Sequence, residues 1–322
     1  MRVSDNRIIK NYLEDLALQG KSERTVSDYH SCIRLYHHWL KEKKLQICSV
    51  NDMGNKGIIE DFLKYLRFEY KKPGGGIMSY KRLKTIFTAL NGLYEYLEYN
   101  TVVEKNIILT VRKRYLKQFK NGHVPAQRKI IDEKKMVEFI NSIANLRDKM
   151  IVTLFVKTGI CRGELIQIDV DDVDMDEQMI TLKKRLFRKR SNPVVFFDEE
   201  TKQLLVFWLR RRKIFANEDE KALFVGQYGG RIDKNTVYNS VVKWAKRFGI
   251  YDKKSKLNKD HFSPHNLRHC FTTYLRQNGM PREFIKELRG DKRSEVIDIY
   301  DHIDPKDLKR EYLSAMPSFN IF

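Results

Sequence analysis

Apolar residues recur every three or four positions through the first 115 residues, which is the spacing of amphipathic helices and not of strands. Four runs carry this pattern, at residues 8–16, 26–40, 58–66 and 79–97. Ser22 and Thr25 precede the second run and Ser79 opens the fourth, as helix N-caps do. The glycine-rich residues 71–76 predict a loop after the third run. The pattern therefore predicts a small helical bundle with a leucine-rich and aromatic interior.

The chain after residue 130 begins with two further predicted helices. Residues 132–140 start with acidic side chains, which favour the first turn of a helix. The apolar run at residues 150–156 predicts a buried helix that stops at Thr158 and Gly159.

Two short β-rich runs follow, at residues 178–182 and 193–197. A basic connection, residues 183–192, joins them, so a hairpin is expected. Helical patterns dominate the remainder. The predicted fold is mainly α with a small antiparallel β-sheet, in a chain long enough for two domains.

The distribution of charged residues indicates where the domains meet and which class of molecule the chain binds. No acidic residue occurs between Glu104 and Asp132, a stretch that holds eight basic residues. We predict a helical DNA-binding domain at residues 1–115, a basic linker at 116–131 and a catalytic domain at 132–322. The net charge of +20 and the pI near 9.6 favour a polyanionic partner. The alternative is a basic surface that serves only solubility.

The sequence carries no sign of a membrane span or of disulfide bonds. No apolar run approaches the ~20 residues that a bilayer requires, and residues 1–6 lack a signal-peptide core. Cys32, Cys48, Cys161 and Cys270 are far apart, so reduced thiols in a cytoplasmic protein are expected.

A His-x-x-Arg pair and a later tyrosine are the strongest chemical signals. His265 and Arg268 lie about one helical turn apart, so both can face one phosphate. Tyr300 follows some thirty residues later, and no metal ligands are apparent nearby, so a side-chain nucleophile is expected. The plain alternative is a chance helical pair and a packing tyrosine. In so basic a chain, the combination indicates DNA strand cleavage.

With these residues in view, the chain resembles the tyrosine recombinases, which include phage integrases and Xer-type recombinases. Residues 158–165 are similar to the family's Thr-Gly-x-Arg-x-x-Glu-Leu box, and residues 264–269 match its His-x-x-Arg-His box. Residues 288–291, with Tyr300 and His302, are similar to its Leu-Gly-His…Tyr-x-His box. The N-terminal bundle resembles the family's core-binding, SAM-like domain.

The resemblance implies a mechanism that uses no cofactor, ATP or metal. Tyr300 attacks the scissile phosphorus and leaves a 3′-phosphotyrosyl link. Arg268 and His265 stabilise the transition state. The implied protein is a site-specific recombinase that acts on double-stranded DNA as a tetramer on two sites and is a monomer or dimer when free.

The resemblance also implies a lysine on the hairpin that protonates the leaving 5′ oxygen. Hairpin tips vary in length, so the choice stays open among Lys183, Lys184 and Arg185, with Lys184 preferred.

The chain departs from the family pattern at two positions. Cys161 stands in the slot of the first catalytic arginine, with Arg162 beside it, and neighbours on a helix point about 100° apart. Either a local shift of the turn lets Arg162 take this role or the activity is reduced, and reduced activity is the first expectation. Asp291 stands where histidine or tryptophan is usual, and its expected role is to orient Arg268, a lysine or Tyr300. Of the neighbouring residues, Glu164 is expected to brace its turn and His269 to pack.

Two other functions stay open. One is a type IB topoisomerase, and the other is a DNA-binding relative that no longer cuts, which Cys161 favours. The apolar residues after 304 predict a tail that packs against a neighbouring subunit, or that folds back onto its own domain. The target site and the direction of reaction cannot be obtained from the sequence.

Overall fold

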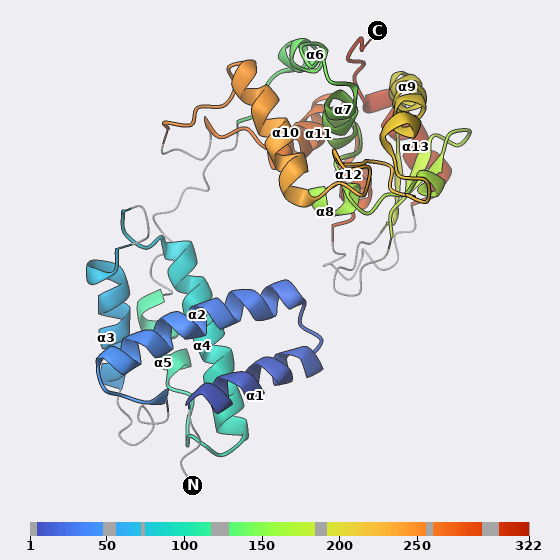
Figure 1. Cartoon of the computed structure of the whole chain (residues 1–322). Coiled ribbons are helices and arrows are strands. Elements are labelled where there is room, and N and C mark those ends of the chain that lie inside the picture. The colour runs from blue at the N-terminus through green and yellow to red at the C-terminus, as the bar shows by residue number, and fades with distance from the viewer. Residues whose placement is uncertain are drawn as a thin grey trace. The chain divides into compact units, whose positions relative to one another are not determined.

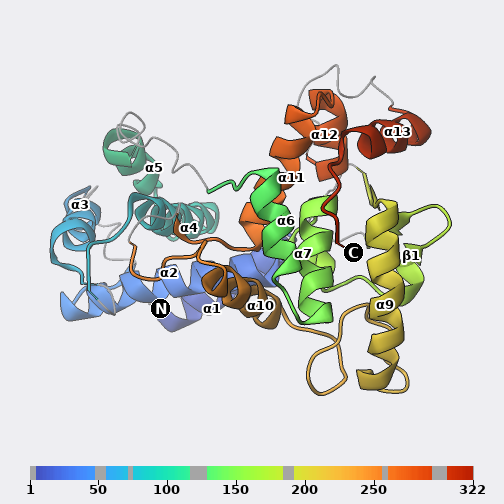
Figure 2. The same ribbon diagram turned by 90° about the horizontal axis from the view of Figure 1, so that it is seen from above.

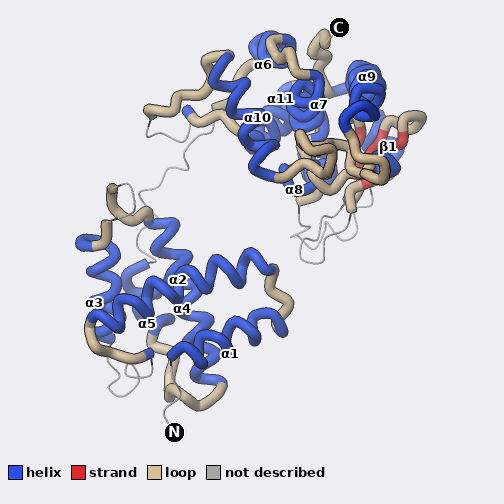
Figure 3. The backbone as a smooth tube through the Cα atoms, viewed as in Figure 1, coloured by secondary structure: helices blue, strands red, loops and turns tan. Residues whose placement is uncertain are grey.

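Helices dominate the computed structural model, which describes residues 5–47, 56–71, 75–116, 129–183, 192–255, 260–291 and 303–321. The chain divides into two units, Met1–Val124 and Pro125–Phe322, called here the N-terminal and C-terminal units (Figure 1). Within the described residues, strands occur only in the C-terminal unit (Figure 3). The predicted fold class is confirmed. Across those same residues, no helix is both long and apolar enough to cross a membrane.

The N-terminal unit is a helical bundle, as its apolar periodicity predicts. Its helices are α1 (Asp5–Leu18), α2 (Glu23–Glu42), α3 (Lys56–Lys64), α4 (Tyr80–Tyr99) and α5 (Ile108–Val111). Helix α2 packs against both α1 and α4 (Figure 1). Ser22 and Ser79 cap α2 and α4 by accepting hydrogen bonds from the backbone N–H groups of Thr25 (3.2 Å) and Arg82 (3.3 Å). Thr25 itself lies inside the helix.

Aromatic side chains fill the interior of this bundle. The hydroxyl groups of Tyr36 and Tyr94 are hydrogen-bonded at 2.9 Å, which satisfies two polar groups in an apolar setting. The Phe62 ring lies 4.9 Å from that of Tyr36 and 5.2 Å from that of Trp39. These contacts hold α2, α3 and α4 together.

Part of the basic stretch after Glu104 belongs to this bundle. Helix α5 continues into a π-helical turn, Arg112–Leu116, and Ile108, Val111 and Leu116 are buried. The guanidinium of Arg112 donates to the hydroxyl of Thr88 at 3.2 Å. Leu116, the first residue of the predicted linker, is thus buried in the core of the bundle, and residues 117–128 lie outside the described part.

The C-terminal unit is built around one buried helix. Its helices are α6 (Glu133–Asn141), α7 (Leu146–Thr158), α8 (Arg162–Leu165), α9 (Glu199–Phe215), α10 (Lys234–Arg247), α11 (Pro264–Gln277), α12 (Arg282–Arg289) and α13 (Pro305–Ala315). Helix α7 contacts α6, α9, α10 and α11, and runs between them in both views (Figures 1 and 2). All its residues from Met150 to Thr158 are buried, so even Lys157 must find partners inside the fold.

A small antiparallel sheet lies at the side of this unit. The strands β1 (Val173–Asp174), β2 (Met179–Thr181) and β3 (Val194–Phe196) are in sequence order, with Ile180 opposite both Val173 and Val195. The predicted antiparallel pairing of the last two strands is confirmed. Strand β1 was not predicted, because two residues are too few to show a period. Residues 184–191 of the connection lie outside the described part.

The C-terminal tail packs on its own unit. Leu308, Tyr312 and Ala315 of α13 are buried against α11 and α12, and the following Phe319 and Ile321 join the main core. The single chain thus has the tail folded back onto its own domain, which is the second of the two expectations, and docking onto a neighbouring subunit in an assembly stays a prediction. The tail folds back because the C-terminal unit itself offers an apolar surface that these side chains cover.

Candidate active site

Helix α11 carries the His-x-x-Arg pair and is held firmly in place. Ser263 is its N-cap, and the Asn266 side chain accepts a hydrogen bond from the Ser263 backbone N–H at 3.0 Å. The buried Leu267 and Phe271 face the core and pack the helix against α7. Arg268, between them in sequence, points out of this apolar face and reaches the ends of two other helices.

The first of these ends is the turn after α7. Gly159 has a left-handed backbone (φ 61°), and a Cβ atom there would lie 2.4 Å from Cδ1 of Phe271. Only glycine combines this conformation with so close a contact. The carbonyl oxygen of Gly159 accepts a hydrogen bond from Nη1 of Arg268.

The second end is the C-terminus of α12. Gly290 is also left-handed (φ 62°), and it turns the chain so that the Asp291 N–H donates to the Lys286 carbonyl at 3.1 Å. This turn brings the Asp291 carboxylate to the end of its own helix. The carbonyl of Arg289 accepts a hydrogen bond from Nη2 of Arg268 at 2.7 Å.

The Arg268 guanidinium thus lies between the C-terminal ends of α7 and α12. Both ends carry partial negative charge, which favours a cation. Its side chain is only 15% exposed, and Nη2 lies 3.7 Å from an oxygen of Asp291. Two backbone carbonyls and a carboxylate fix the plane of this group before any ligand binds.

A second guanidinium, which the sequence did not single out, shares this carboxylate. Nε of Arg289 lies 3.2 Å from Oδ2 of Asp291, and its Nη1 donates to the Thr272 hydroxyl at 3.4 Å. Asp291 is therefore flanked by Arg268 and Arg289. Its contact with Arg268 is present, whereas its role in a reaction stays a prediction. Arg289 could have been noticed as a cation inside the third box.

The two histidines of α11 lie edge to face. The ring of His265 is 4.6 Å from that of His269, with an angle of 81° between their planes. His265 is exposed at the first turn of the helix, one turn before Arg268, whereas His269 is half-buried. His265 is thus open to a ligand approaching this end of α11.

Cys161 and Arg162 begin α8, and they face different surroundings. The N–H of Cys161 donates to the Glu164 carboxylate at 2.6 Å, which is the expected brace. The Arg162 guanidinium lies against α10: it donates to the Lys234 carbonyl at 3.2 Å and lies 5.2 Å from the centre of the Tyr238 ring. The fold thus directs Arg162 to α10, while Arg268 is held at the α7 and α12 ends.

One of the candidate lysines is already engaged. Lys183 forms an ion pair with Asp169 and lies 3.6 Å from Asp172. The hydrogen bond that Lys183 donates to the Asp169 carboxylate raises the pKa of Lys183, because it stabilises the charged ammonium. Lys184, Arg185 and the nucleophile candidate Tyr300 lie outside the described residues.

The comparisons with known proteins agree over nearly the whole chain. Residues 129–307 match the phage integrase family, and residues 8–104 match the N-terminal SAM-like domain of phage integrases. The tyrosine recombinase XerC of Corynebacterium glutamicum is 33% identical over 218 residues, 62% of this chain and 67% of XerC. The tyrosine recombinase XerA of Saccharolobus solfataricus is 25% identical over 312 residues, 95% of this chain and 92% of XerA.

Solved structures show the same fold at lower identity. The XerH site-specific recombinase bound to its difH substrate has a TM-score of 0.63 and 19% identity, covering 96% of this chain and 83% of XerH. A lambda integrase dimer bound to a core site has a TM-score of 0.62 and 16% identity, over 93% of this chain and 98% of that one. Since the family match extends over more than half of the chain, the protein belongs to the phage integrase family of tyrosine recombinases.

Proposed function

We propose that the protein is a site-specific DNA recombinase that cleaves and rejoins DNA strands through a 3′-phosphotyrosyl intermediate. One observation carries the proposal. Gly159, Arg268 and Arg289 come from three boxes of the sequence, yet they meet through two hydrogen bonds of one guanidinium. A cation held ready in this way suits the stabilisation of a charged phosphoryl transition state.

In this proposal Tyr300 is the nucleophile. Its hydroxyl gives up its proton to water, the oxygen attacks the phosphorus, the bond to the 5′ oxygen breaks, and that oxygen takes up a proton. The phosphotyrosyl bond retains the energy of the phosphodiester, so a 5′ hydroxyl can reverse the step and rejoin the strands. Lys184, Lys183 or Arg185 supplies the proton to the leaving oxygen.

Arg268, His265 and Arg289 bind the phosphate in this proposal. Arg289 supplies the second guanidinium, because Cys161 offers no charge and the Arg162 guanidinium is bound at α10. Asp291 keeps the two arginines in position by contacting both. Two guanidiniums and one carboxylate leave a net positive charge for the phosphate.

Double-stranded DNA is the proposed partner. The net charge of +20 supports it. The related XerH is bound to its difH substrate, and lambda integrase is bound to a core site as a dimer. A tetramer on two DNA sites is the proposed active assembly, and the helical N-terminal unit with the following basic residues is proposed to hold the DNA.

Covalent capture tests the proposal. Binding sites are first selected from randomised duplexes, and the selected site is then nicked so that the cleaved strand diffuses away and traps the enzyme. A protein–DNA adduct that survives SDS supports strand cleavage, and exchange between two intact sites supports recombination. Tight binding with no adduct for any selected site would contradict the proposed chemistry.

A second function has an observation in its favour. The position of the first arginine holds Cys161, and Arg162 is directed to α10, so the transition state is left with fewer cations. This arrangement favours a DNA-binding relative that has lost cleavage. The capture experiment separates the two, since such a protein selects a site but forms no adduct.

A further inference from the structure

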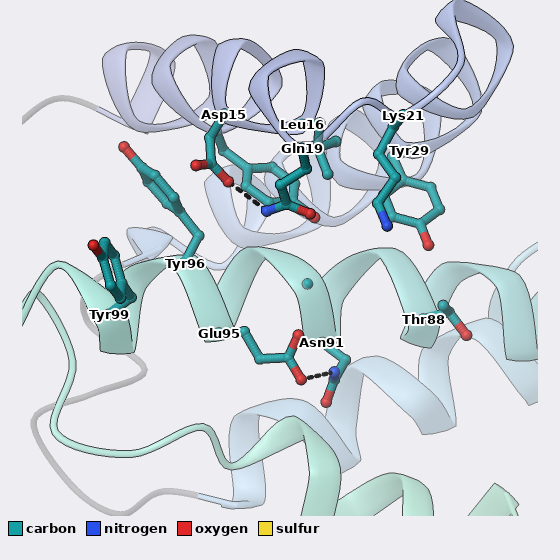
Figure 4. A pocket seen from close by; sticks show the side chains of 12 residues that line it. Asp15, Leu16, Gln19, Lys21, Tyr29, Thr88, Asn91, Glu95, Tyr96 and Tyr99 are labelled. Carbon is teal, nitrogen blue, oxygen red and sulfur yellow. Dashed lines mark hydrogen bonds between the residues drawn. The ribbon is translucent and has the colours of Figure 1, made fainter. Parts of the chain in front are cut away.

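The N-terminal unit contains a pocket whose lining includes none of the candidate active-site residues. Its volume is about 420 Å³. It lies between helix α1, helix α4 and the N-terminal part of helix α2 (Figure 4). Tyrosines and acids define its lining, and we call it the tyrosine–carboxylate pocket: Tyr12, Asp15, Tyr29, Glu95, Tyr96 and Tyr99. Such a volume is within the range of small-molecule sites.

Among the described residues, the hydrogen-bond partners of the two carboxylates in this pocket are neutral amides. Asp15 accepts a hydrogen bond from the Gln19 amide and Glu95 accepts one from the Asn91 amide, both at 2.7 Å. No ion pair joins Asp15 or Glu95 to a basic side chain of the described chain. At the wall of the pocket the Arg112 guanidinium donates to Thr88 at 3.2 Å and pairs with neither acid. The one lysine of the lining, Lys21, is exposed and lies beside Tyr29 (Figure 4).

The hydroxyl of Tyr12 supplies an independent sign of a ligand. Tyr12 is 1% exposed, lines the pocket, and its hydroxyl has no hydrogen-bond partner among the described residues. A Cβ atom at Gly92 would lie 2.3 Å from this oxygen, so the glycine makes room for it. A buried hydroxyl without a partner costs free energy unless a ligand satisfies it.

The surroundings of the Tyr12 hydroxyl are negatively charged. Burial raises the pKa of Tyr12, and Tyr29, Glu95 and Asp15 raise it further. The two carboxylates place a negative potential at the oxygen, which favours a cationic donor. The ring of Tyr96 lies 5.6 Å from that of Tyr12, and aromatic faces attract cations.

We propose that the tyrosine–carboxylate pocket binds a small alkylammonium ion, of the class of the diamines and polyamines. The ammonium group donates to Glu95, Asp15 and the Tyr12 hydroxyl, and the alkyl chain lies along the tyrosine rings. Free amine, and not a basic protein segment, is the proposed ligand, because the site is a pocket of limited volume. Long-range repulsion from a strongly basic chain opposes any cation, so saturable binding requires local contacts.

Calorimetric titration of the full chain without DNA tests this assignment, with 1,5-diaminopentane as the probe and 1,5-pentanediol as its neutral counterpart. We expect saturable binding of the diamine and none of the diol. Glu95→Gln should weaken the diamine at least about tenfold, because a charge-assisted contact becomes a neutral one. Glu98→Gln removes an exposed carboxylate of the same helix that does not line the pocket, and it should bind as the unchanged chain does.

Tyr12→Phe keeps the ring and removes the hydroxyl, so the variant should fold and bind the diamine less tightly. Circular dichroism of each variant confirms folding. The proposal is overturned if the diamine does not saturate or if the diol binds equally. It also fails if Glu98→Gln weakens binding as much as Glu95→Gln, since the effect is then diffuse screening. Unchanged affinity in Tyr12→Phe would likewise overturn the contact to the hydroxyl.

Discussion

The ammonium group of Lys157 lies 4.2 Å from the centre of the Phe319 ring, so a buried cation of the central helix is covered by the C-terminal tail. The same nitrogen donates to Asp198 at 2.5 Å and to the Pro317 carbonyl at 2.6 Å, and it forms an ion pair with Glu200. Lys157 is completely buried. A buried charge of this kind depends on every partner that replaces water.

We therefore predict that the tail stabilises the free chain. Phe319→Ala should lower the free energy of unfolding by about 3–5 kcal/mol, because it opens a cavity and removes the aromatic cover of the cation. Leu313→Ala is the matched control, since Leu313 lies on the neighbouring α13 and is 40% exposed. Denaturant unfolding measures both. Equal effects of the two changes would contradict the docking of the tail on its own unit.

Deletion of residues 306–322 tests the same contact on a larger scale. The truncated chain should melt at a lower temperature, because Lys157 loses Pro317 and Phe319 and the core loses α13. Thermal unfolding by circular dichroism measures this. If the melting temperature does not change, the tail contributes no stability in the free chain.

Tyr300→Phe should abolish covalent attachment to DNA and leave affinity almost unchanged. The hydroxyl performs the chemistry, whereas charge dominates binding. SDS gels of the trapped complex and a binding titration at fixed salt provide the two measurements. An SDS-resistant adduct in the Phe variant would assign the nucleophile to another residue.

Arg289→Ala should lower the rate of cleavage by about 10²-fold if this arginine supplies the second phosphate contact. Cys161→Arg should raise the rate in the unchanged chain by up to about the same factor, and it should restore part of the loss in Arg289→Ala. The four rates form a double-mutant cycle. If the effects of Arg289→Ala and Cys161→Arg are independent, the two positions do not share the role of second phosphate contact. Arg162→Ala is the control, because it removes a neighbouring cation that is bound at α10.

The general acid can be identified by chemical rescue. Lys183→Ala, Lys184→Ala and Arg185→Ala are each compared on a normal substrate and on one with sulfur at the bridging 5′ position. A thiolate leaves without protonation, so the variant that lacks the acid should recover on the sulfur substrate alone. We expect recovery for Lys184→Ala. Recovery in Lys183→Ala would instead require that its ion pair with Asp169 opens on DNA.

The basic residues at the end of the N-terminal unit should make DNA binding depend steeply on salt. Lys113 and Arg114 are exposed, whereas Arg112 is half-buried and donates to Thr88. Replacing Lys113 and Arg114 by Gln should flatten the slope of log K against log salt by up to about 0.9 for each lost phosphate contact. Arg112→Gln should change the slope less and stability more. An unchanged slope in the double variant would show that these two side chains face solvent.

Local rules of the sequence were sufficient for helices α1 to α4, α6 and α7 and for strands β2 and β3. The periodicity of residues 26–40 and the caps Ser22 and Ser79 predicted α2 and α4, because each signal acts within a few residues along the chain. The order of the three boxes likewise identified the family and nominated Arg268, His265 and Tyr300. Strand β1 lacked such a signal, since its two residues form only by pairing with β2.

Directions and partners of long side chains were decided only by the tertiary structure. The sequence places Arg162 next to Cys161, which stands in the slot of the first arginine, but it does not give the direction of the Arg162 side chain. The structure gives it, since the guanidinium donates to the Lys234 carbonyl of α10. Arg289 lies in the third box at a position with no expected role, and it joins the site because the turn at Gly290 brings Asp291 back beside it. The apolar residues of the tail could cover any apolar surface. In the folded chain they pack on the C-terminal unit itself, where Phe319 and the Pro317 carbonyl contact the buried Lys157. These outcomes depend on contacts between residues far apart in the sequence. Several groups can bind the same long side chain, and a local sequence pattern does not show which of them lies within reach in the folded chain.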